Sequence, residues 1–569
     1  MRVLIIDGYT DEPAGLGVPP YMDVNPRYIA GAAWSLDPLT DVRYITIDEA
    51  RRNPSRVSGE SSSSDIAILI AGVTVPGKYL GGAPATLNDA LSLPKIMGSK
   101  RRAICGPAMR FGFGKGGGSR TFIPQDLNNL YDFVITGDPE TVVFDLISSG
   151  FDESTDLEAE RASENSINEF AKRGARIASM HPCFPGGLIC ELESYRGCAR
   201  SLGGGCSFCT EPLHGLPDFR SVKGIANEVG ALCSAGVVNF RLGRQPDLLV
   251  YGAKNIDTSL PEPNPQAIRR LLSAVRKAAP TLRVLHIDNV NPATLSTHPV
   301  PSEKALKAIV EHHTPGDVAA LGIESVDEAV ILKNNLKVDY DGAMAAVALI
   351  NKVGSTRGEN GLPHLLPGIN FVYGLPGETE STFEANYEFM KDILDRGLMV
   401  RRINLRQVMV MPSTRMESSG DYLMRKHKSL FIKHKLKMRQ GIDLPMLARV
   451  VPQWTVLRDL RTELVEGKMT WCRQIGSYPI LVGIPSPLPV GETLDAIVLS
   501  HGPRSVGALP VPLRINSMSM REIEAIPGIG SKRAAAILRG RPYASAGALR
   551  RAVDDPSVIE SLIPFLAFH

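Results

Sequence analysis

The sequence predicts an α/β protein with a Rossmann-like, doubly wound N-terminal domain, a partial (β/α)6 barrel, a small C-terminal β segment and a helix-hairpin-helix. Two observations carry this prediction. Short apolar runs alternate with helix-length segments over most of the chain, and the alternation restarts with a new rhythm near residue 181. Apolar strands separated by crossovers indicate parallel sheets. The 569 residues also require several domains, because single cores stop growing at about 250–300 residues.

Composition and charge narrow the class of protein. The chain is 43% apolar and 22% charged, with 63 basic and 60 acidic residues. This balance excludes a uniformly basic nucleic-acid coat protein and a disordered acidic tail, and it leaves local patches open. No apolar run approaches the roughly 20 residues of a membrane-spanning helix. Residues 1–7 read as a strand and not as a secretory signal. We therefore expect a cytoplasmic protein without membrane contact.

Residues 1–150 form the first predicted domain. Its strands are expected at the apolar runs 2–7, 42–47, 66–73, 102–105 and 133–137. In such a sheet, ligand-binding loops follow the carboxyl ends of the strands. The serine-rich stretch 57–64 predicts a loop, and the acidic stretch 152–169 predicts a surface helix within a linker, residues 151–180. The stretch 112–117 matches a dinucleotide fingerprint formally, but it follows the fourth strand, which favours a plain glycine loop.

Residues 181–415 form the predicted barrel. Its six strands are expected at 187–192, 237–242, 284–287, 319–323, 369–373 and 403–409. Most of these runs are followed by a polar turn and a helix-length pattern, so the six βα units make most of a parallel barrel. Such barrels carry their chemistry on the loops that follow the strands. Functional residues are therefore expected at the strand ends.

The remaining chain is predicted to hold three smaller units. Residues 416–475 are expected to be mostly helical, and they include the basic run 425–439 with seven Lys or Arg residues. This run is interpreted either as a solvated helix face or as part of an electrostatic track for nucleic acid. Residues 476–516 carry short β runs between Pro and Gly residues and are consistent with a small β-barrel. Residues 517–569 have helical patterns.

A loop with three cysteines follows the first predicted barrel strand. Cys198, Cys206 and Cys209 are three of eight cysteines in the chain, and five of the eight lie within residues 183–209. Three thiolates on one loop can bind three irons of a [4Fe–4S] cluster and leave the fourth iron open to an external ligand. A zinc site that uses these cysteines and one further ligand is the alternative. Inert thiols are a third interpretation.

This loop resembles that of the radical S-adenosylmethionine (radical SAM) superfamily, whose usual ligand pattern is C-x3-C-x2-C with an aromatic residue before the last cysteine. Phe208 occupies the aromatic position, and Tyr-Arg-Gly before Cys198 resembles methylthiotransferase-like members. The seven-residue gap at 199–205 departs from the usual three, and its glycines allow the extra residues to loop out. The resemblance implies that Cys198, Cys206 and Cys209 bind the cluster.

Further segments at predicted strand ends resemble the same superfamily, in the same order along the chain. Residues 321–325 are similar to its fourth-strand GxES motif, and residues 374–379 to its GxPGET turn. Residues 411–414 resemble a PGT turn, and a single glycine matches the GGE turn after the second strand. The residues thereby implied to contact SAM are Phe208, Gly243, Glu324, Ser325, Tyr373, Gly374 and Leu375.

The resemblance also implies a mechanism and cofactors. SAM chelates the open iron of the cluster, and one-electron reduction cleaves SAM to methionine and a 5′-deoxyadenosyl radical, which abstracts hydrogen from the substrate. An electron donor such as ferredoxin or flavodoxin is the implied partner. The N-terminal domain resembles the cobalamin-binding domain of many members, so it either binds cobalamin or keeps this fold for substrate or packing. The sequence has no histidine before His181 that could ligate cobalt.

Residues 526–534 match a helix-hairpin-helix. Its turn carries Gly528 and Gly530 and is followed by Lys532 and Arg533. Backbone N–H groups at such a helix start bind the phosphates of RNA or DNA without reading sequence. A protein-docking or packing hairpin is the alternative. Residues 476–516 resemble a TRAM RNA-binding barrel, and the whole layout resembles an archaeal-type radical SAM family with this C-terminal hairpin.

Three functions follow from these features. The leading one is a radical SAM enzyme that modifies a nucleic acid such as tRNA, because the hairpin and the basic run occur in one chain with the cysteine loop. The second keeps the chemistry but acts on a protein or a small metabolite. The third is a zinc-containing nucleic-acid-binding protein without catalysis. No catalytic residue for the substrate step is predicted.

Overall fold

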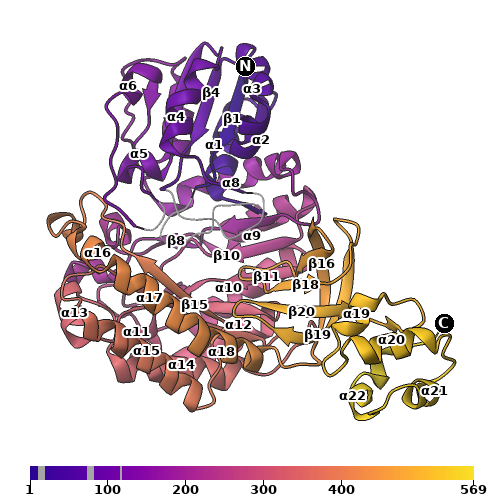
Figure 1. Cartoon of the computed structure of the whole chain (residues 1–569). Helices are drawn as coiled ribbons and strands as arrows, with labels where there is room; N and C mark the ends of the chain where they lie inside the picture. Colours follow the sequence, from indigo (N-terminus) through magenta and orange to yellow (C-terminus); the bar gives the residue numbers. More distant parts are fainter. Residues whose placement is uncertain (11–19, 74–81, 116–117, 569) are drawn as a thin grey trace.

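The computed structural model describes residues 1–10, 20–73, 82–115 and 118–568. Figure 1 shows the N-terminal domain at the top, the parallel strands of the barrel below it, and a β-barrel with the C-terminal helices to the right. Part of the glycine stretch 112–117 lies outside the described residues. Across the described ranges, no helix combines the length and the apolar character that crossing a bilayer requires.

The N-terminal sheet has five parallel strands in the order β3-β1-β4-β5-β6. Alternate residues of β1 face two different cores, with Val3 and Ile5 toward α1 and α7 and Leu4 and Ile6 toward α2 and α3. The predicted parallel α/β sheet is confirmed. Its strands are β1 (Arg2–Asp7), β3 (Asp41–Thr46), β4 (Ile66–Ile70), β5 (Arg101–Cys105) and β6 (Phe133–Val134), and its helices are α1 (Val24–Leu36), α2 (Ile47–Arg52), α3 (Pro54–Ser62), α4 (Leu87–Ser92), α5 (Pro107–Phe111), α6 (Leu127–Leu130) and α7 (Pro139–Ser148).

The predicted loop at 57–64 is wrong, because most of it lies in helix α3. Asn53 caps this helix by accepting the N–H of Arg56, and Pro54 occupies its first turn. Val57 is buried, and Ser62 Oγ donates back to the carbonyl oxygen of Ser58 at 2.7 Å. Capping and burial of one apolar side chain therefore override the weak helix propensity of serine.

The predicted surface helix at 152–169 is also wrong. The N–H groups of Thr136 and Gly137 donate to the carbonyl oxygen of Leu157, so the segment runs beside the end of β6. It ends in a 3-10 turn (Glu164–Ile167) before α8 (Asn168–Gly174). The acidic residues do not all face water, since the side chain of Glu164 is buried and pairs with Arg161 in an ion-pair network described below.

All six predicted barrel strands are present, but they lie in two four-stranded sheets, β11-β10-β7-β2 and β12-β13-β14-β15. The chain passes from one sheet to the other at Asp288, whose buried carboxylate accepts from Arg241 and from Tyr478. The strands are β7 (Ile189–Leu192), β10 (Asn239–Leu242), β11 (Val284–Ile287), β12 (Asn289–Val290), β13 (Asp317–Glu324), β14 (Leu365–Tyr373) and β15 (Arg402–Gln407), and the helices are α9 (Val222–Ser234), α10 (Pro265–Ala278), α11 (Pro292–Thr297), α12 (Pro299–His312), α13 (Glu328–Asn334), α14 (Tyr340–Gly354) and α15 (Glu380–Asp395).

The edge strand β2 (Tyr21–Met22) comes from the N-terminal domain and pairs in parallel with β7. The predicted boundary at residue 150 therefore does not separate two independent units, because β2 extends the barrel's first sheet and the following helix α1 contacts strands of both units, β1 and β7. Helix α1 packs against α7 and α8, and its Arg27 forms a buried ion pair with Glu228 of α9.

The segment 416–475 is helical only in its first half. Helices α16 (Tyr422–Lys426), α17 (Lys428–Met438) and α18 (Leu444–Val450) precede a closed five-stranded β-barrel of β16 (Val456–Glu466), β17 (Met469–Arg473), β18 (Leu481–Ile484), β19 (Thr493–His501) and β20 (Ser505–Pro510). The β-barrel thus begins about 20 residues before the predicted boundary at 476. Strand β16 is difficult to predict from the sequence, because it is half-exposed and rich in charged residues, with polar residues between the buried Leu457 and Leu460.

The C-terminal helices form a small unit that packs on this β-barrel. Ile497, Leu499 and Leu509 of the β-barrel share one hydrophobic core with Ile523 and Ile537. Strand β22 (Leu566–Ala567) pairs in parallel with β21 (Leu513–Arg514), which closes the unit. The helices are α19 (Met520–Glu524), α20 (Ser531–Arg539), α21 (Ala546–Arg551) and α22 (Ser557–Glu560).

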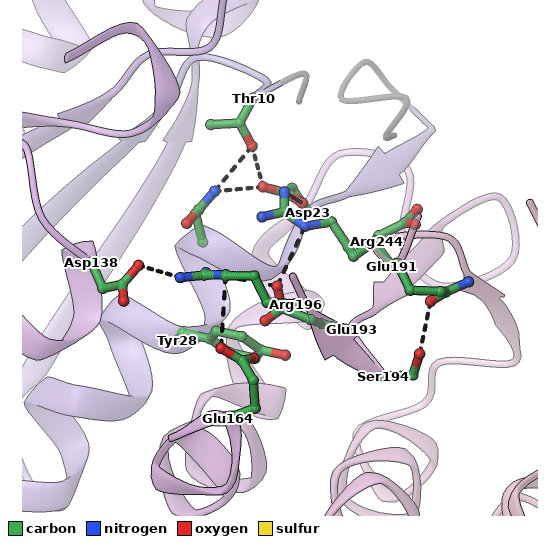
Figure 2. Close-up of polar contacts among 12 residues, drawn as sticks. Thr10, Asp23, Tyr28, Asp138, Glu164, Glu191, Glu193, Ser194, Arg196 and Arg244 are labelled. Atoms are coloured by element: carbon green, nitrogen blue, oxygen red, sulfur yellow. Dashed lines mark hydrogen bonds and ion pairs between the residues drawn. The ribbon is translucent and has the colours of Figure 1, made fainter. Parts of the chain in front are cut away.

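A buried ion-pair network joins the N-terminal domain to the first barrel strand. Arg161, with 2% of its side chain exposed, contacts Glu140, Glu164 and Glu193. Figure 2 shows the adjoining part, in which Arg196 donates to Asp138 at 2.6 Å. Burial alone would raise the pKa of Asp138, but the charges of Arg196 and Arg161 outweigh it and lower that pKa to about 2.

Replacing Arg161 with Met is expected to lower the free energy of unfolding by about 3–5 kcal/mol, because it leaves Glu140, Glu164 and Glu193 buried without their shared cation. The loss should be larger at pH 8 than at pH 5. A buried carboxylate without a cation has a raised pKa, so it is protonated and uncharged at the lower pH. Urea unfolding followed by circular dichroism at both pH values measures this difference.

The matched control is Arg56→Met, which breaks the surface pair with Glu49 at 2.7 Å. This change should cost less than about 1 kcal/mol at either pH. An Arg161→Met protein as stable as the control would show that the network does not hold the two domains together.

Candidate active site

A cavity of about 380 Å³ lies at the carboxyl ends of the barrel strands. Four parts of the chain form its walls: the cysteine loop, the ends of β12 to β15, the loops of the N-terminal domain, and α17 with the C-terminal β-barrel. Representative lining residues, in that order, are Cys206, Phe208 and Cys209; Asn289, Glu324, Asn370 and Arg406; Val73 and Gly118; and Phe431, Lys435 and Arg504. A ligand bound here would contact every unit except the C-terminal helices.

The cysteine loop accommodates its long gap as a compact turn. Residues Ala199–Gly203 form a 3-10 turn, and Gly204 and Gly205 have φ values of 76° and 63°, a conformation that glycine adopts without strain. Asn335, at the end of α13, donates to the carbonyl oxygens of Gly203 and Gly205 at 2.9 and 2.8 Å. The looped-out residues are therefore anchored to the barrel, and Cys206 follows directly.

The charges of the three cysteines all act on the side chain of Lys337. Cys206 and Cys209 line the cavity. Burial lowers the pKa of Lys337, but the charges of Cys206, Glu324, Cys209 and Cys198 outweigh burial and raise it. Burial raises the pKa of the Cys198 thiol to about 11.

The donor set suits an iron–sulfur cluster. In the described ranges, no three Cys, His, Asp or Glu side chains stand close enough together to hold a metal ion as they are. Even so, three thiols lie on one loop, their charges act on the half-buried Lys337, and two of them line the cavity. A [4Fe–4S] cluster takes one thiolate per iron, so this set would hold three irons and leave the fourth facing the cavity.

Glu324 reaches the cavity through an irregular strand end. The pairing of β13 with β14 shifts between Gly322 and Glu324, and Glu324 has a φ of 68°, which is costly for a residue with a side chain. A Cβ placed on Gly322 would lie 2.5 Å from both Glu324 Oε1 and Lys337 Nζ. The missing side chain at Gly322 therefore makes room for this pair of opposite charges.

The other residues predicted to contact SAM divide into lining and buried residues. Phe208 lines the cavity and packs beside Leu375, which is fully buried in a hydrophobic cluster. Ser325 is fully buried, and its Oγ accepts the N–H of Asp327. The structure thus brings Phe208 and Glu324 to the cavity together with Cys206 and Cys209, and it does not bring Leu375 or Ser325 there.

Tyr373 and Gly374, also predicted to contact SAM, serve the packing of the strand end. The Tyr373 ring stacks on Phe383 with 4.7 Å between the ring centroids, and its hydroxyl lies 2.7 Å from His434 Nε2. Gly374 has a φ of 91° and donates its N–H to Glu378 at 2.6 Å. The GxPGET-like turn is therefore stabilised by a hydrogen bond to its own glutamate, Glu378.

Gly243 lies beside buried charges and away from the cavity lining. A Cβ on Gly243 would come within 2.1 Å of Glu191 Oε1, so only glycine fits next to this carboxylate. The following Arg244 turns toward the N-terminal domain and donates to Asp23 at 3.0 Å (Figure 2). This position, where the resemblance implies a contact with the SAM amino group, therefore joins the two domains.

The residues of the predicted hairpin lie far along the chain, between α19 and α20. Gly528 has a φ of 81°, and Gly530 caps α20. Lys532 is exposed. Arg533 pairs with Asp554 at 2.5 Å and donates to the carbonyl oxygen of Gly528 at 2.6 Å. Of the two predicted phosphate-binding cations, Lys532 is exposed and Arg533 is already engaged within the unit.

Sequence reasoning missed most of the charged residues of the cavity. Lys337 follows the recognised motif by about a dozen residues, and Arg402 and Arg406 lie on a strand that was predicted only from its apolar residues. Lys435 and Arg439 belong to the basic run, and their spacing from Phe431 by four and eight residues places all three on one helix face. That spacing is the one signal that could have identified them.

Comparison with known proteins places the chain in a family. Residues 192–390 match the model of the radical SAM superfamily. An uncharacterized protein of the archaeon Archaeoglobus fulgidus is 42% identical over 93% of this chain and 93% of its own length. An uncharacterized protein of Methanocaldococcus jannaschii is 44% identical over 89% of this chain and 92% of its own length.

Two solved structures have similar folds at low identity. The radical S-adenosylmethionine methyltransferase TsrM from Kitasatospora setae has a TM-score of 0.47 and 13% identity, covering 73% of this chain and 74% of TsrM. The cobalamin-dependent S-adenosylmethionine radical enzyme OxsB has a TM-score of 0.47 and 14% identity, covering 76% of this chain and 56% of OxsB.

The chain belongs to the radical SAM superfamily. It is an enzyme, and this decides against the interpretation as a zinc-containing protein without catalysis. The superfamily uses a [4Fe–4S] cluster and SAM, and the cysteine loop and cavity described above are the part of the chain that suits both.

His427 is predicted to hold helix α17 against the strand-end turn. Its Nδ1 lies 2.7 Å from Glu378 Oε1, so His427→Ala would leave a buried carboxylate without this partner. Removing the partner should cost about 1–3 kcal/mol and increase amide hydrogen exchange in residues 422–438. The conservative His427→Gln, which can still donate, should restore most of the protection. Equal exchange in the wild-type and Ala proteins would contradict this role.

Proposed function

We propose that this enzyme binds a [4Fe–4S] cluster through Cys198, Cys206 and Cys209, cleaves SAM reductively at that cluster, and modifies a nucleic acid such as tRNA. The observation that carries the cluster assignment is that Cys206 and Cys209 of the three-cysteine loop line the cavity together with Glu324 and Lys337. Bound there, the cluster supplies the electron that converts SAM into methionine and a 5′-deoxyadenosyl radical.

The chain's own residues prepare the cavity for this chemistry. Phe208 and the buried cluster around Leu375 exclude water from the side next to the cysteines. Glu324 and Lys337 offer one carboxylate and one ammonium group within reach of the amino, carboxylate and hydroxyl groups of SAM. Gly322 leaves the space between them open.

Binding of cobalamin by the N-terminal domain is a secondary part of this proposal. The described loops of the N-terminal domain bring Val73 and Gly118 to the cavity wall, so a cofactor carried by this domain would adjoin the SAM site. With no histidine before His181 in the sequence, this domain would bind cobalamin without an axial histidine of its own.

Replacing Cys198, Cys206 and Cys209 together with Ala is expected to remove the iron and all SAM cleavage. Anaerobically prepared wild-type protein should contain about four irons per chain, and dithionite should drive formation of 5′-deoxyadenosine. Cys105→Ala and Cys472→Ala serve as controls, because both side chains are buried in other cores. A triple variant that keeps its iron would overturn the ligand assignment, and one zinc per chain in place of iron would restore the zinc interpretation of this loop.

The nucleic-acid substrate is supported by the C-terminal unit and by the basic run on α17. The N-terminal end of α20 exposes Lys532 beside the Gly528–Gly530 turn, an arrangement suited to phosphate. A protein or small-metabolite substrate is the second candidate, favoured by the engagement of Arg533 with Asp554 inside the unit.

Lys532→Glu is expected to weaken binding of bulk tRNA and to flatten its salt dependence by roughly one unit of slope, because one phosphate contact is lost. This point change is preferable to deleting residues 517–569, which would expose Ile497, Leu499 and Leu509 of the β-barrel. Binding should be measured by fluorescence anisotropy across a salt series. Lys468→Glu, at an exposed hairpin turn, is the control of equal charge change. If the two variants bind equally, the hairpin is a docking or packing element.

A further inference from the structure

The wall of the cavity opposite the cysteine loop carries a strong excess of positive charge. Acidic residues are fewer than basic ones in the whole lining, and the basic ones come from β15, α17 and the β-barrel as well as from the segment after α13. The acids are Glu211, Glu324 and Asp443, and the bases are Lys337, Arg402, Arg406, Lys435, Arg439 and Arg504.

Four of these cations form one cluster from three segments of the chain. Arg402 begins β15, Lys435 and Arg439 lie one turn apart at the end of α17, and Arg504 lies between β19 and β20. Burial and the charges of Arg406 and Arg504 together lower the pKa of Arg402 to about 10, against the opposing charges of Tyr478 and Asp288. Burial and the charges of Arg439 and Arg504 lower the pKa of Lys435. The positive charges of this cluster therefore disfavour one another, as their common position on one cavity wall implies.

Asp443 is the acidic residue that lines the cavity beside these four cations, and it lies four residues after Arg439. Among the described residues, the side chains of Arg402, Lys435, Arg439 and Arg504 make no hydrogen bond or ion pair, and Nη2 of Arg402 is buried without a partner. Arg402 rests on the Tyr478 ring, 4.2 Å from its centroid. Asp288 is a carboxylate whose charge acts on Arg402, but it is already paired with Arg241 and Tyr478.

The contrast with the interior of the barrel shows that this arrangement is unusual for the molecule. Arg161, Arg220 and Arg241 are as buried as side chains can be, and each contacts at least one carboxylate. Leaving a charged group buried without a partner is costly. Arg402 is the member of the cluster to which this argument applies, because its Nη2 is buried without a partner, and a bound anion would supply that partner.

The position of the cluster suits a substrate and is separate from the SAM side of the cavity. Arg402 and Arg504 also border a second cavity of about 370 Å³ between β15 and the β-barrel. Arg406 bridges the two sides, because its charge acts on Glu324 as well as on Arg402. An anion held at the cluster would leave the rest of its molecule extending toward Cys206 and Cys209.

We propose that Arg402, Lys435, Arg439 and Arg504 form a subsite for a phosphate-type anionic group of the substrate and so place the hydrogen-donating carbon in front of the cysteine loop. This inference rests on the proposed radical chemistry for its meaning, but not for its test. Four cations that converge from three segments suit an anion with more than one charge, which a carboxylate does not offer.

The experiment is an equilibrium titration of the full-length, anaerobically purified protein with sodium pyrophosphate at constant ionic strength, followed by calorimetry. The double variant Lys435→Gln/Arg504→Gln should bind pyrophosphate at least ~10-fold more weakly, because two charged hydrogen-bond donors are lost. The double variant Lys433→Gln/Arg514→Gln removes two exposed charges elsewhere and should bind like the wild type. Acetate should bind none of the three proteins measurably.

Two further variants keep the result interpretable. Arg504 is exposed at a turn, so Arg504→Gln alone should leave the free energy of unfolding nearly unchanged, and it should still weaken the binding of pyrophosphate. Arg504→Lys keeps the charge and should recover most of the affinity. The subsite is overturned if pyrophosphate does not bind the wild type, or if both double variants bind it equally. Neither readout requires SAM cleavage. Failure of the cluster assignment would therefore leave the pyrophosphate result standing, and failure of pyrophosphate binding would leave the cluster assignment standing.

A second arm identifies the source of the phosphate. If the subsite holds the backbone of a nucleic acid, a 5′-phosphorylated RNA hexanucleotide should bind more tightly than pyrophosphate and should lose affinity in both Lys435→Gln/Arg504→Gln and Lys532→Glu. If it holds a free phosphorylated metabolite, pyrophosphate should bind at least as tightly as the hexanucleotide, and Lys532→Glu should change neither. Both outcomes support the subsite, and they decide between the two substrate classes.

Discussion

The pairing of buried arginines with buried carboxylates between the N-terminal domain and the barrel is the constraint on which the active-site cavity depends. Arg161 and Arg196 lie among Asp138, Glu164 and Glu193, and Arg244 reaches across to Asp23. Removing such charges from water costs several kcal/mol each unless all are satisfied together. The two units can therefore meet in only a narrow range of positions, and in that position the N-terminal loops bring Val73 and Gly118 over the cavity.

The apolar periodicity of the sequence was sufficient to predict the parallel sheets, but not the segments outside them. Strands such as β1 and β4 are buried on both faces, so their apolar runs are continuous and easy to recognise. The stretch 57–64 was predicted as a loop because serine has a weak helix propensity, although the helix has a capped start and one buried valine. Strand β16 was missed because charged residues cover its exposed face. Both errors arise where tertiary burial overrides local composition.

The family motifs predicted the cysteines and the strand ends, but they predicted the roles of individual residues less well. Glu324 and Phe208 line the cavity, whereas Tyr373 and Ser325 are used to fix the strand ends against α15 and α17. A motif records which positions matter without separating a residue that contacts a ligand from one that shapes the backbone beside it. Lys337 and the four-cation cluster belong to no motif, because their neighbours lie up to 170 residues apart and meet only through the fold.

Arginine thus has two opposite uses in one molecule, and the difference lies in what each guanidinium faces. At the domain interface the arginines are matched by carboxylates, which fixes geometry and leaves no charge for a ligand. At the cavity Glu211 and Glu324 lie on the cysteine side, and the opposite wall keeps an excess of positive charge, with Asp443 beside Arg402, Lys435, Arg439 and Arg504. A charge separation of this kind orients any substrate that carries an anion, since its negative end is drawn to one wall and its remaining atoms are left at the other. Orientation of this sort is what a radical enzyme requires, because a reactive radical abstracts hydrogen from whichever carbon is held nearest.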